Sequence, residues 1–140
     1  MKLRYNYRIY PTEKQKEKLA QTFGCARVVW NDSLAIIKGL EKGEKWPSNG
    51  ELQKLVITQA KQTEERSWLS DVSAVPLQQS VRDLGTTLSS FIKSLKGERK
   101  GPKQGFPRFK RKDDEQSVRF VRQGFSIKGN KVYLAKIGRL

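Results

Sequence analysis

The spacing of apolar residues changes along this chain, and these changes constrain its fold more than any other feature. Residues 2–9 alternate between polar and apolar side chains, which predicts a half-buried strand. Between residues 12 and 95 apolar side chains recur every three or four positions, which predicts helices. Alternation by two returns from Ser117. This order predicts an α+β fold: a small sheet or partial barrel, with one N-terminal and about three C-terminal strands, interrupted by about four helices.

Capping residues predict where the helices begin. A capping box from Thr12 to Gln15 precedes the first helix, which Gly24 can end, and Ser48 with Glu51 repeats the pattern later. Pro76 is typical of a first helical turn. The expected helices cover residues 12–23, 26–38, 48–60 and 73–95. Their core positions are Ala26, Trp30, Leu34, Ile37, Leu52, Leu55, Val56, Ala60, Leu77, Val81, Leu84, Leu88 and Leu95, with Cys25 and Trp68 also inside.

Turn residues divide the C-terminal half. Gly and Pro punctuate residues 97–116, so we expect a loop there. The Gly129-Asn130 pair predicts a hairpin that joins Ser126–Lys128 to Lys131–Leu134. The predicted organisation is a β domain from residues 1–10 and 105–140, a helical insertion at 11–96, and a basic loop at 97–116.

The charge is large and unevenly distributed. The chain has 140 residues and a formal net charge of +15, and residues 91–140 hold 15 of the 29 basic side chains but only four of the 14 acidic ones. Such a block predicts a surface for a polyanion. The alternative is a solvated basic tail. Because aromatic residues interrupt the block, and disordered tails are poor in aromatics, we favour the binding surface.

Missing residue types exclude several kinds of site. The chain has no His and a single Cys, which excludes a Ser–His–Asp or Cys–His catalytic unit, a His-ligated metal and an internal disulfide. No apolar run approaches the ~20 residues of a membrane helix. The acidic cluster Asp113–Glu115 is better interpreted as a solvated turn than as nuclease ligands. We therefore expect no catalytic residue, metal, cofactor, small-molecule substrate or membrane, in a cytoplasmic protein that joins the nucleoid when bound to DNA.

The strongest local signal for nucleic-acid binding is the stretch GFPRFKRK at 105–112. Its Arg and Lys residues suit phosphate contacts, while Phe106 and Phe109 either anchor the loop in the core or stack on bases. A weaker signal is a helix-turn-helix outline around Phe23-Gly24-Cys25. Trp46 could stack on a base or pack on the third helix. In the helix-turn-helix, the side chains that could face DNA are Arg27, Asn31, Asp32, Ser33 and Lys38.

Three stretches in order resemble the N-terminal region of the TnpB (OrfB) family of insertion sequences. They are RIYPTEKQKEKLAQTFGCARVVWNDSL near the start, SWLSDVSAVPLQQSVRDL with the GFPRFKRK loop, and IKGNKVYLAKIG near the end. The resemblance implies a wedge domain with an inserted helical recognition domain. Family members are RNA-guided nucleases related to type V CRISPR effectors. They cut with a RuvC-type domain of three metal-binding carboxylates, which a Cys-rich zinc ribbon follows.

The family comparison predicts binding without cutting. The chain ends at Leu140 before such a nuclease domain, and one Cys cannot form the ribbon, so we expect a truncated, non-enzymatic portion that contacts guide RNA and double-stranded DNA. The alternatives are a non-functional transposase remnant and a stand-alone helix-turn-helix DNA-binding protein. The loop and strand cations would contact RNA or heteroduplex, and the start of the fourth helix would contact flanking duplex. The candidate residues are Arg27, Trp46, Gln78, Gln79, Arg82, Arg99, Lys100, Lys103, Arg108, Lys110, Arg111, Lys112, Arg119 and Arg122.

Overall fold

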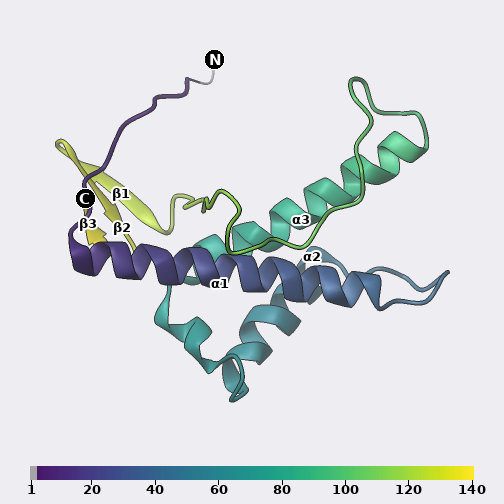
Figure 1. Ribbon diagram of the computed structural model, residues 1–140, viewed down its shortest axis with the longest axis horizontal. Coiled ribbons are helices and arrows are strands. Elements are labelled where there is room, and N and C mark those ends of the chain that lie inside the picture. Colours follow the sequence, from purple (N-terminus) through teal and green to yellow (C-terminus); the bar gives the residue numbers. More distant parts are fainter. Residues whose placement is uncertain (1–2) are drawn as a thin grey trace.

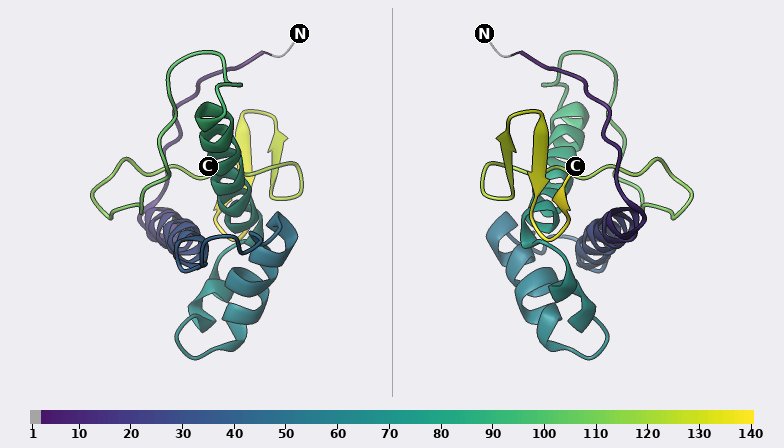
Figure 2. Two further views of the ribbon diagram at one scale, coloured as in Figure 1. Left: turned by 90° about the vertical axis from the view of Figure 1, so that its right-hand side faces the viewer. Right: turned by 90° about the vertical axis from the view of Figure 1, so that its left-hand side faces the viewer.

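A computed structural model describes residues 3–140 and confirms the α+β class. Helix α1 (Glu13–Lys38) lies against α3 (Ala74–Leu95), and a three-stranded antiparallel sheet stands beside the start of α1 (Figure 1). Between these helices come α2 (Asn49–Gln53), a π-helical segment η1 (Lys54–Gln59), and the 3-10 segments η2 (Ala60–Gln62) and η3 (Ser67–Asp71). This connecting unit extends away from the side of the molecule that carries the N-terminal segment (Figure 2).

Helix α1 is one continuous helix, so the predicted break at Gly24 is wrong. The Thr12 capping box forms as expected, and Gly39 is the C-cap. Gly24 is not among the residues with positive φ, and the Thr22 hydroxyl donates to the Lys18 carbonyl within the helix instead of capping a new one. An interior glycine costs a helix only about 1 kcal/mol relative to alanine, which tertiary packing can offset. The 26-residue helix therefore replaces the two expected helices.

The predicted third helix forms, but its inward face differs from the prediction. Ser48 caps α2 by accepting from the Glu51 N–H, as expected. The chain then widens into the π-helical segment η1, whose different number of residues per turn rotates the following side chains. As a result Val56 and Ile57 are buried, whereas Leu55, predicted to be inside, is 43% exposed.

The packing of α1 on α3 forms the core. Trp30, Leu34 and the predicted α3 positions from Leu77 to Leu88 are buried, and the Ser80 hydroxyl donates to the Ala26 carbonyl across the interface at 2.8 Å. Besides Leu55, two predicted core residues are exposed. Leu95 lies beyond the contact at the end of α3, and Trp68 is 38% exposed with its indole N–H bonded to the Glu65 carbonyl.

The predicted N-terminal strand does not form among the described residues 3–9, and Lys2 lies outside them. The segment is extended and unpaired, with Leu3, Tyr5 and Tyr7 at least 65% exposed. The described sheet has the order β1-β2-β3 and includes no strand from this segment. A strand needs a hydrogen-bonded neighbour, and alternation in the sequence cannot supply one.

The predicted hairpin is confirmed. Strands β1 (Phe125–Lys128) and β2 (Lys131–Leu134) pair with Lys128 opposite Lys131, around Gly129 at φ 61°. The strand expected from Ser117 is absent, because residues 117–124 form a loop that ends in a turn. The third strand is instead β3 (Gly138–Arg139), paired with β2.

Two long-range hydrogen bonds fix the sheet on the helices. The Gln15 side-chain amide, part of the α1 capping box, donates to the Arg139 carbonyl at 2.5 Å. The Lys136 ammonium donates to the Ser70 carbonyl at 2.7 Å. The sheet is therefore attached at the start of α1 and at η3.

Replacing Gly24 by Ala tests whether α1 is continuous. In an uninterrupted helix the variant should raise the free energy of unfolding by about 0.5–1 kcal/mol, because a Cβ there meets only the Arg27 side chain, at 3.8 Å. Urea denaturation followed by circular dichroism measures this. Gly129→Ala is the matched control and should destabilise, since φ there is 61°. Destabilisation by Gly24→Ala would indicate a helix-turn-helix turn at this position.

Candidate nucleic-acid interface

The basic loop is attached to α1 through its backbone. The Trp30 indole N–H donates to the Arg108 carbonyl at 2.9 Å. The Asn31 side chain makes two hydrogen bonds with Lys110, accepting from its N–H at 2.8 Å and donating to its carbonyl at 3.0 Å. Adjacent side chains of one helix therefore bond to the loop at alternate residues. No local pattern predicts this contact, since Trp30 is expected in the core and Asn31 is expected to face DNA.

The loop aromatics face the helices. Phe106 packs edge-on against Phe91 of α3, with ring centroids 5.3 Å apart. Lys38 of α1 places its ammonium 4.7 Å from the centroid of the Phe109 ring and 5.9 Å from that of Phe106. Phe106 therefore anchors the loop to the core, one of the two roles predicted for it. Phe109 stays 45% exposed.

Most of the predicted cations stay on the surface around this attachment. Arg99 donates to the Pro102 carbonyl within its own turn, and Asp114 closes the next turn by accepting from the Arg111 N–H at 2.9 Å. That turn is the solvated turn expected for the acidic cluster. All of the predicted loop and strand cations are exposed residues, including Lys110 and Arg119, which also make the contacts described below; the others are Arg99, Lys100, Lys103, Arg108, Arg111, Lys112 and Arg122.

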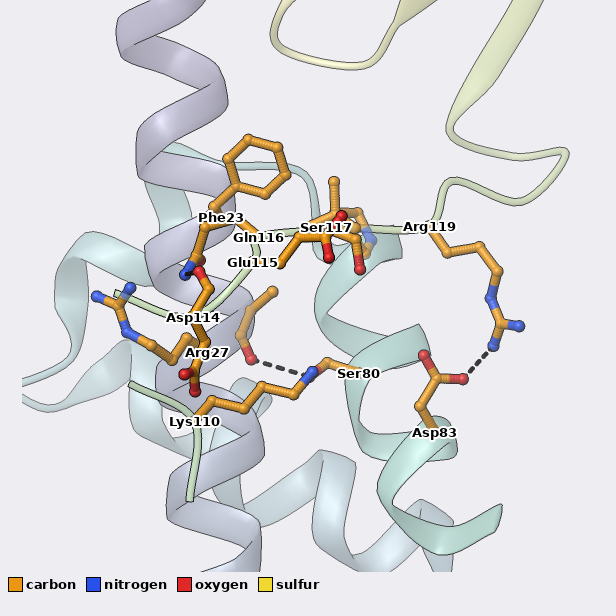
Figure 3. A pocket seen from close by; sticks show the side chains of 13 residues that line it. Phe23, Arg27, Ser80, Asp83, Lys110, Asp114, Glu115, Gln116, Ser117 and Arg119 are labelled. Carbon is orange, nitrogen blue, oxygen red and sulfur yellow. Dashed lines mark hydrogen bonds and ion pairs between the residues drawn. The ribbon is translucent and has the colours of Figure 1, made fainter. Parts of the chain in front are cut away.

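Lys110 differs from the other loop cations. Its ammonium lies 4.2 Å from the centroid of the Trp30 indole, a cation–π contact. Desolvation by this packing lowers the pKa of Lys110, and the negative charge of Asp83 partly opposes that shift. In Figure 3 the Lys110 side chain runs from the loop toward Ser80 on α3.

The structure brings three predicted residues together around one cavity of about 230 Å³ between α1, α3 and residues 110–119. Arg27 and Lys110 line it, and Arg119 lines it while paired with Asp83 (Figure 3). The Arg119 guanidinium also donates to the Gln79 side chain at 3.0 Å. Gln79 is buried and serves this contact, so it does not face outward as the prediction required.

A second, more open groove runs between α2 and α3. Its space is about 800 Å³, and its lining includes Arg82 and Lys93 but no acidic residue. Predicted residue Arg82 is thus exposed on this groove, apart from the loop cations. Gln78 is half-buried near the start of the same helix, and Trp46 is 37% exposed in the connection before α2.

The second half of α1 does not present a free reading face. Asn31 is bonded to Lys110, and Lys38 lies on the loop aromatics. Asp32 accepts from Arg66 at 2.9 and 3.2 Å, and Ser33 is fully buried. The expectation that Asn31, Asp32 and Ser33 could face DNA is therefore wrong, because tertiary contacts or burial occupy them, whereas Lys38 stays exposed. Arg27 alone of that set stays at a cavity.

Within residues 3–140, no three His, Cys, Asp or Glu side chains gather closely enough to hold a metal ion. In the same part of the chain, no helix combines the length and the apolar character needed to cross a membrane.

Cys25 is buried at the α1–η3 contact, as predicted for a small apolar residue. Burial, with a smaller effect of the nearby Asp71 charge, raises the pKa of its thiol to about 11. Since the unfolded thiol titrates near 8.5, the folded state favours the neutral form. The neutral thiol therefore contributes to the free energy of unfolding. This contribution is complete below about pH 8 and is lost as the pH rises toward 11.

Comparison with known proteins supports the family resemblance. Residues 1–45 match a family described as the helix-turn-helix domain of OrfB from IS605-type elements. A candidate RNA-guided DNA endonuclease of Streptomyces pristinaespiralis is 34% identical over 97% of this chain. Another, InsQ of Escherichia coli K12, is 26% identical over 96%. The resemblance to the TnpB/OrfB family is confirmed. The chain spans 32% of the length of each of these relatives.

The family description and the observed geometry differ in one respect. The TnpB-like region called a helix-turn-helix contains the exposed N-terminal segment and a single helix α1 in this structure. The face of α1 toward the loop holds the Arg108–Lys110 backbone. On this face of α1 the loop therefore covers the helix.

Replacing Asn31 by Ala tests the attachment of the loop. The loss of two hydrogen bonds should lower the free energy of unfolding by about 1–2 kcal/mol and speed tryptic cleavage after the loop cations. Urea titration and timed proteolysis measure both effects. Asn6→Ala, in the exposed N-terminal segment, should change stability by less than about 0.5 kcal/mol. An unchanged cleavage rate in Asn31→Ala would contradict the attachment.

The burial of Cys25 has its own test. At about pH 8, a thiol-reactive dye should label the folded protein on the order of 100-fold more slowly than the chain in concentrated guanidinium chloride, because the thiolate is scarcer and shielded. Absorbance of the released dye measures the rate. Similar rates in the two conditions would show that Cys25 is accessible.

Proposed function

We propose that this chain is a nucleic-acid-binding portion of a TnpB-like RNA-guided endonuclease, contacting guide RNA and target-flanking DNA. One observation carries the proposal: the backbone of the basic loop is fixed on α1, while most of its charged ends are exposed. A preformed cationic surface loses less conformational entropy on binding than a flexible tail does. This favours the binding surface over the solvated tail.

The loop is the proposed site for the guide RNA or the guide–target heteroduplex backbone. Trp30 and Asn31 hold the backbone of Arg108 and Lys110. The side chains of Arg108, Arg111 and Lys112 are exposed there. Their charges can neutralise successive phosphates, which releases counterions and gives salt-dependent affinity. Arg122 adds another exposed positive charge in the turn before β1.

The α2–α3 groove is the proposed site for the duplex beside the target. Arg82 and Lys93 lie eleven residues apart on α3, which corresponds to roughly 16 Å along the helix. Hydroxyl side chains at Thr86, Ser89 and Ser90 line the groove between them and can donate to phosphate or sugar oxygens. The absence of acidic lining residues in this described groove favours a polyanion.

We propose no cutting reaction for this chain. The relatives named as endonucleases are about three times as long, and the described residues here gather no carboxylate cluster for a metal. Two-metal nuclease chemistry requires such clustered ligands. The contribution that we propose for this chain is binding and positioning of nucleic acid.

Charge removal from the loop tests the proposal. The triple variant Arg108→Gln, Arg111→Gln, Lys112→Gln should weaken binding to a single-stranded RNA and reduce the slope of log affinity against log salt by about two. Fluorescence anisotropy across a salt series measures both quantities. The control variant Lys14→Gln, Lys18→Gln, Lys42→Gln removes the same charge from exposed positions outside the loop.

The control should retain most of the slope, because its charges lie away from the proposed contacts. Equal losses in the two variants would show that only net charge matters and would contradict a loop site. A salt-independent affinity of the unmodified chain would contradict phosphate binding altogether. A non-functional remnant would show no cooperative thermal transition in circular dichroism.

A further inference from the structure

The cavity between α1, α3 and residues 110–119 is not explained by phosphate contacts. Its volume of about 230 Å³ is several times the ~30 Å³ that one water occupies in the liquid. Three parts of the chain, far apart in sequence, form its walls (Figure 3). The basic loop contributes Lys110, Asp114, Glu115 and Gln116 to its lining.

The charges around this cavity balance. Three cations and three carboxylates line it: Arg27, Lys110 and Arg119, with Asp83, Asp114 and Glu115. A phosphate group favours a site with excess positive charge, which the outer loop supplies and the cavity does not. A nucleobase is neutral and presents donors and acceptors together on its edge. The lining therefore suits a base better than a phosphate.

Two of the carboxylates already have partners. Asp83 is paired with Arg119, and Asp114 accepts from the Arg111 N–H. Within residues 3–140, no hydrogen bond or ion pair engages the side chains of Arg27 or Glu115. One acceptor and one donor therefore remain for a ligand, in addition to the Lys110 ammonium.

The cavity also has an apolar wall. Phe23 of α1 is half-buried there, and the partly buried Val118 packs against the core beside it. In Figure 3 the Phe23 ring lies at the edge of the cavity, opposite the side that Lys110 crosses. An aromatic face can stack on a base and offset the cost of unstacking it from its strand.

We propose that this cavity binds one unpaired cytosine or guanine from a strand whose phosphates lie on the basic loop, an inference that rests on the proposed function. Glu115 accepts from the exocyclic amino group, and Arg27 or Lys110 donates to the carbonyl oxygen of the same base. Cytosine and guanine carry both groups. Uracil and thymine lack the amino group, and adenine lacks the carbonyl oxygen.

The test compares strands of equal length and charge. Labelled oligo(rC), oligo(rU) and oligo(rA), with oligo(dC) and oligo(dT), are titrated with the full chain at neutral pH and followed by anisotropy. We expect cytosine strands to bind about tenfold more tightly than uracil or thymine strands. The ribose and deoxyribose arms distinguish an RNA from a DNA source, since only the former offers a 2′-hydroxyl.

Two variants separate base recognition from charge. Glu115→Ala should remove the cytosine preference. Asp113→Ala should keep the cytosine preference. This substitution removes the same charge two positions before Glu115, at a residue that does not line the cavity. Circular dichroism melts establish that both variants fold.

Each outcome tests either the cavity proposal or the proposed function on which it rests. Three outcomes overturn the cavity proposal: equal binding of cytosine and uracil strands, loss of the cytosine preference in both variants, or persistence of that preference in Glu115→Ala. In each of these cases salt-dependent binding still supports the proposed function. Absence of salt-dependent binding to any strand overturns both proposals.

Discussion

The packing of α1 against α3 is the contact on which the rest of the structure depends. Leucines of both helices are fully buried in it, and the hydrogen bond from Ser80 to the Ala26 carbonyl fixes how the helices face each other. Burial of such side chains contributes roughly 1.5–3 kcal/mol each. The remaining parts of α1 attach the other elements: its first turn bonds to β3, and its second half bonds to the basic loop.

This arrangement gives a strongly basic loop a defined shape. A chain with net charge +15 repels itself, and residues 91–140, which include the loop, carry most of that excess. The loop is nevertheless held, because its anchoring contacts use backbone groups and aromatic rings, and leave most charged ends in solvent. Attachment through the backbone thus separates the stability of the loop from its capacity to contact phosphates. Lys110 is the exception, since its ammonium lies on Trp30.

Local signals predicted local features correctly. The Thr12 and Ser48 caps and the turn at Gly129 depend on residues a few positions apart, and each forms as predicted. Several other predictions failed because tertiary contacts outweighed the local pattern. Residues 3–9 lack a pairing strand, Gly24 continues a helix that tertiary packing supports, and the π-helical turn moves Leu55 outward.

The sequence by itself determined the helix caps, the α3 apolar stripe, the hairpin, the concentration of charge and the family resemblance, because each is written in neighbouring residues or in composition. Only the tertiary structure decided which charged side chains are available. Arg119 is paired with Asp83, and Asn31 is committed to Lys110, through contacts 36 and 79 residues apart along the chain. Whether a cationic side chain faces solvent or pairs with a carboxylate depends on which distant residue folding places beside it. A local sequence pattern does not predict that residue.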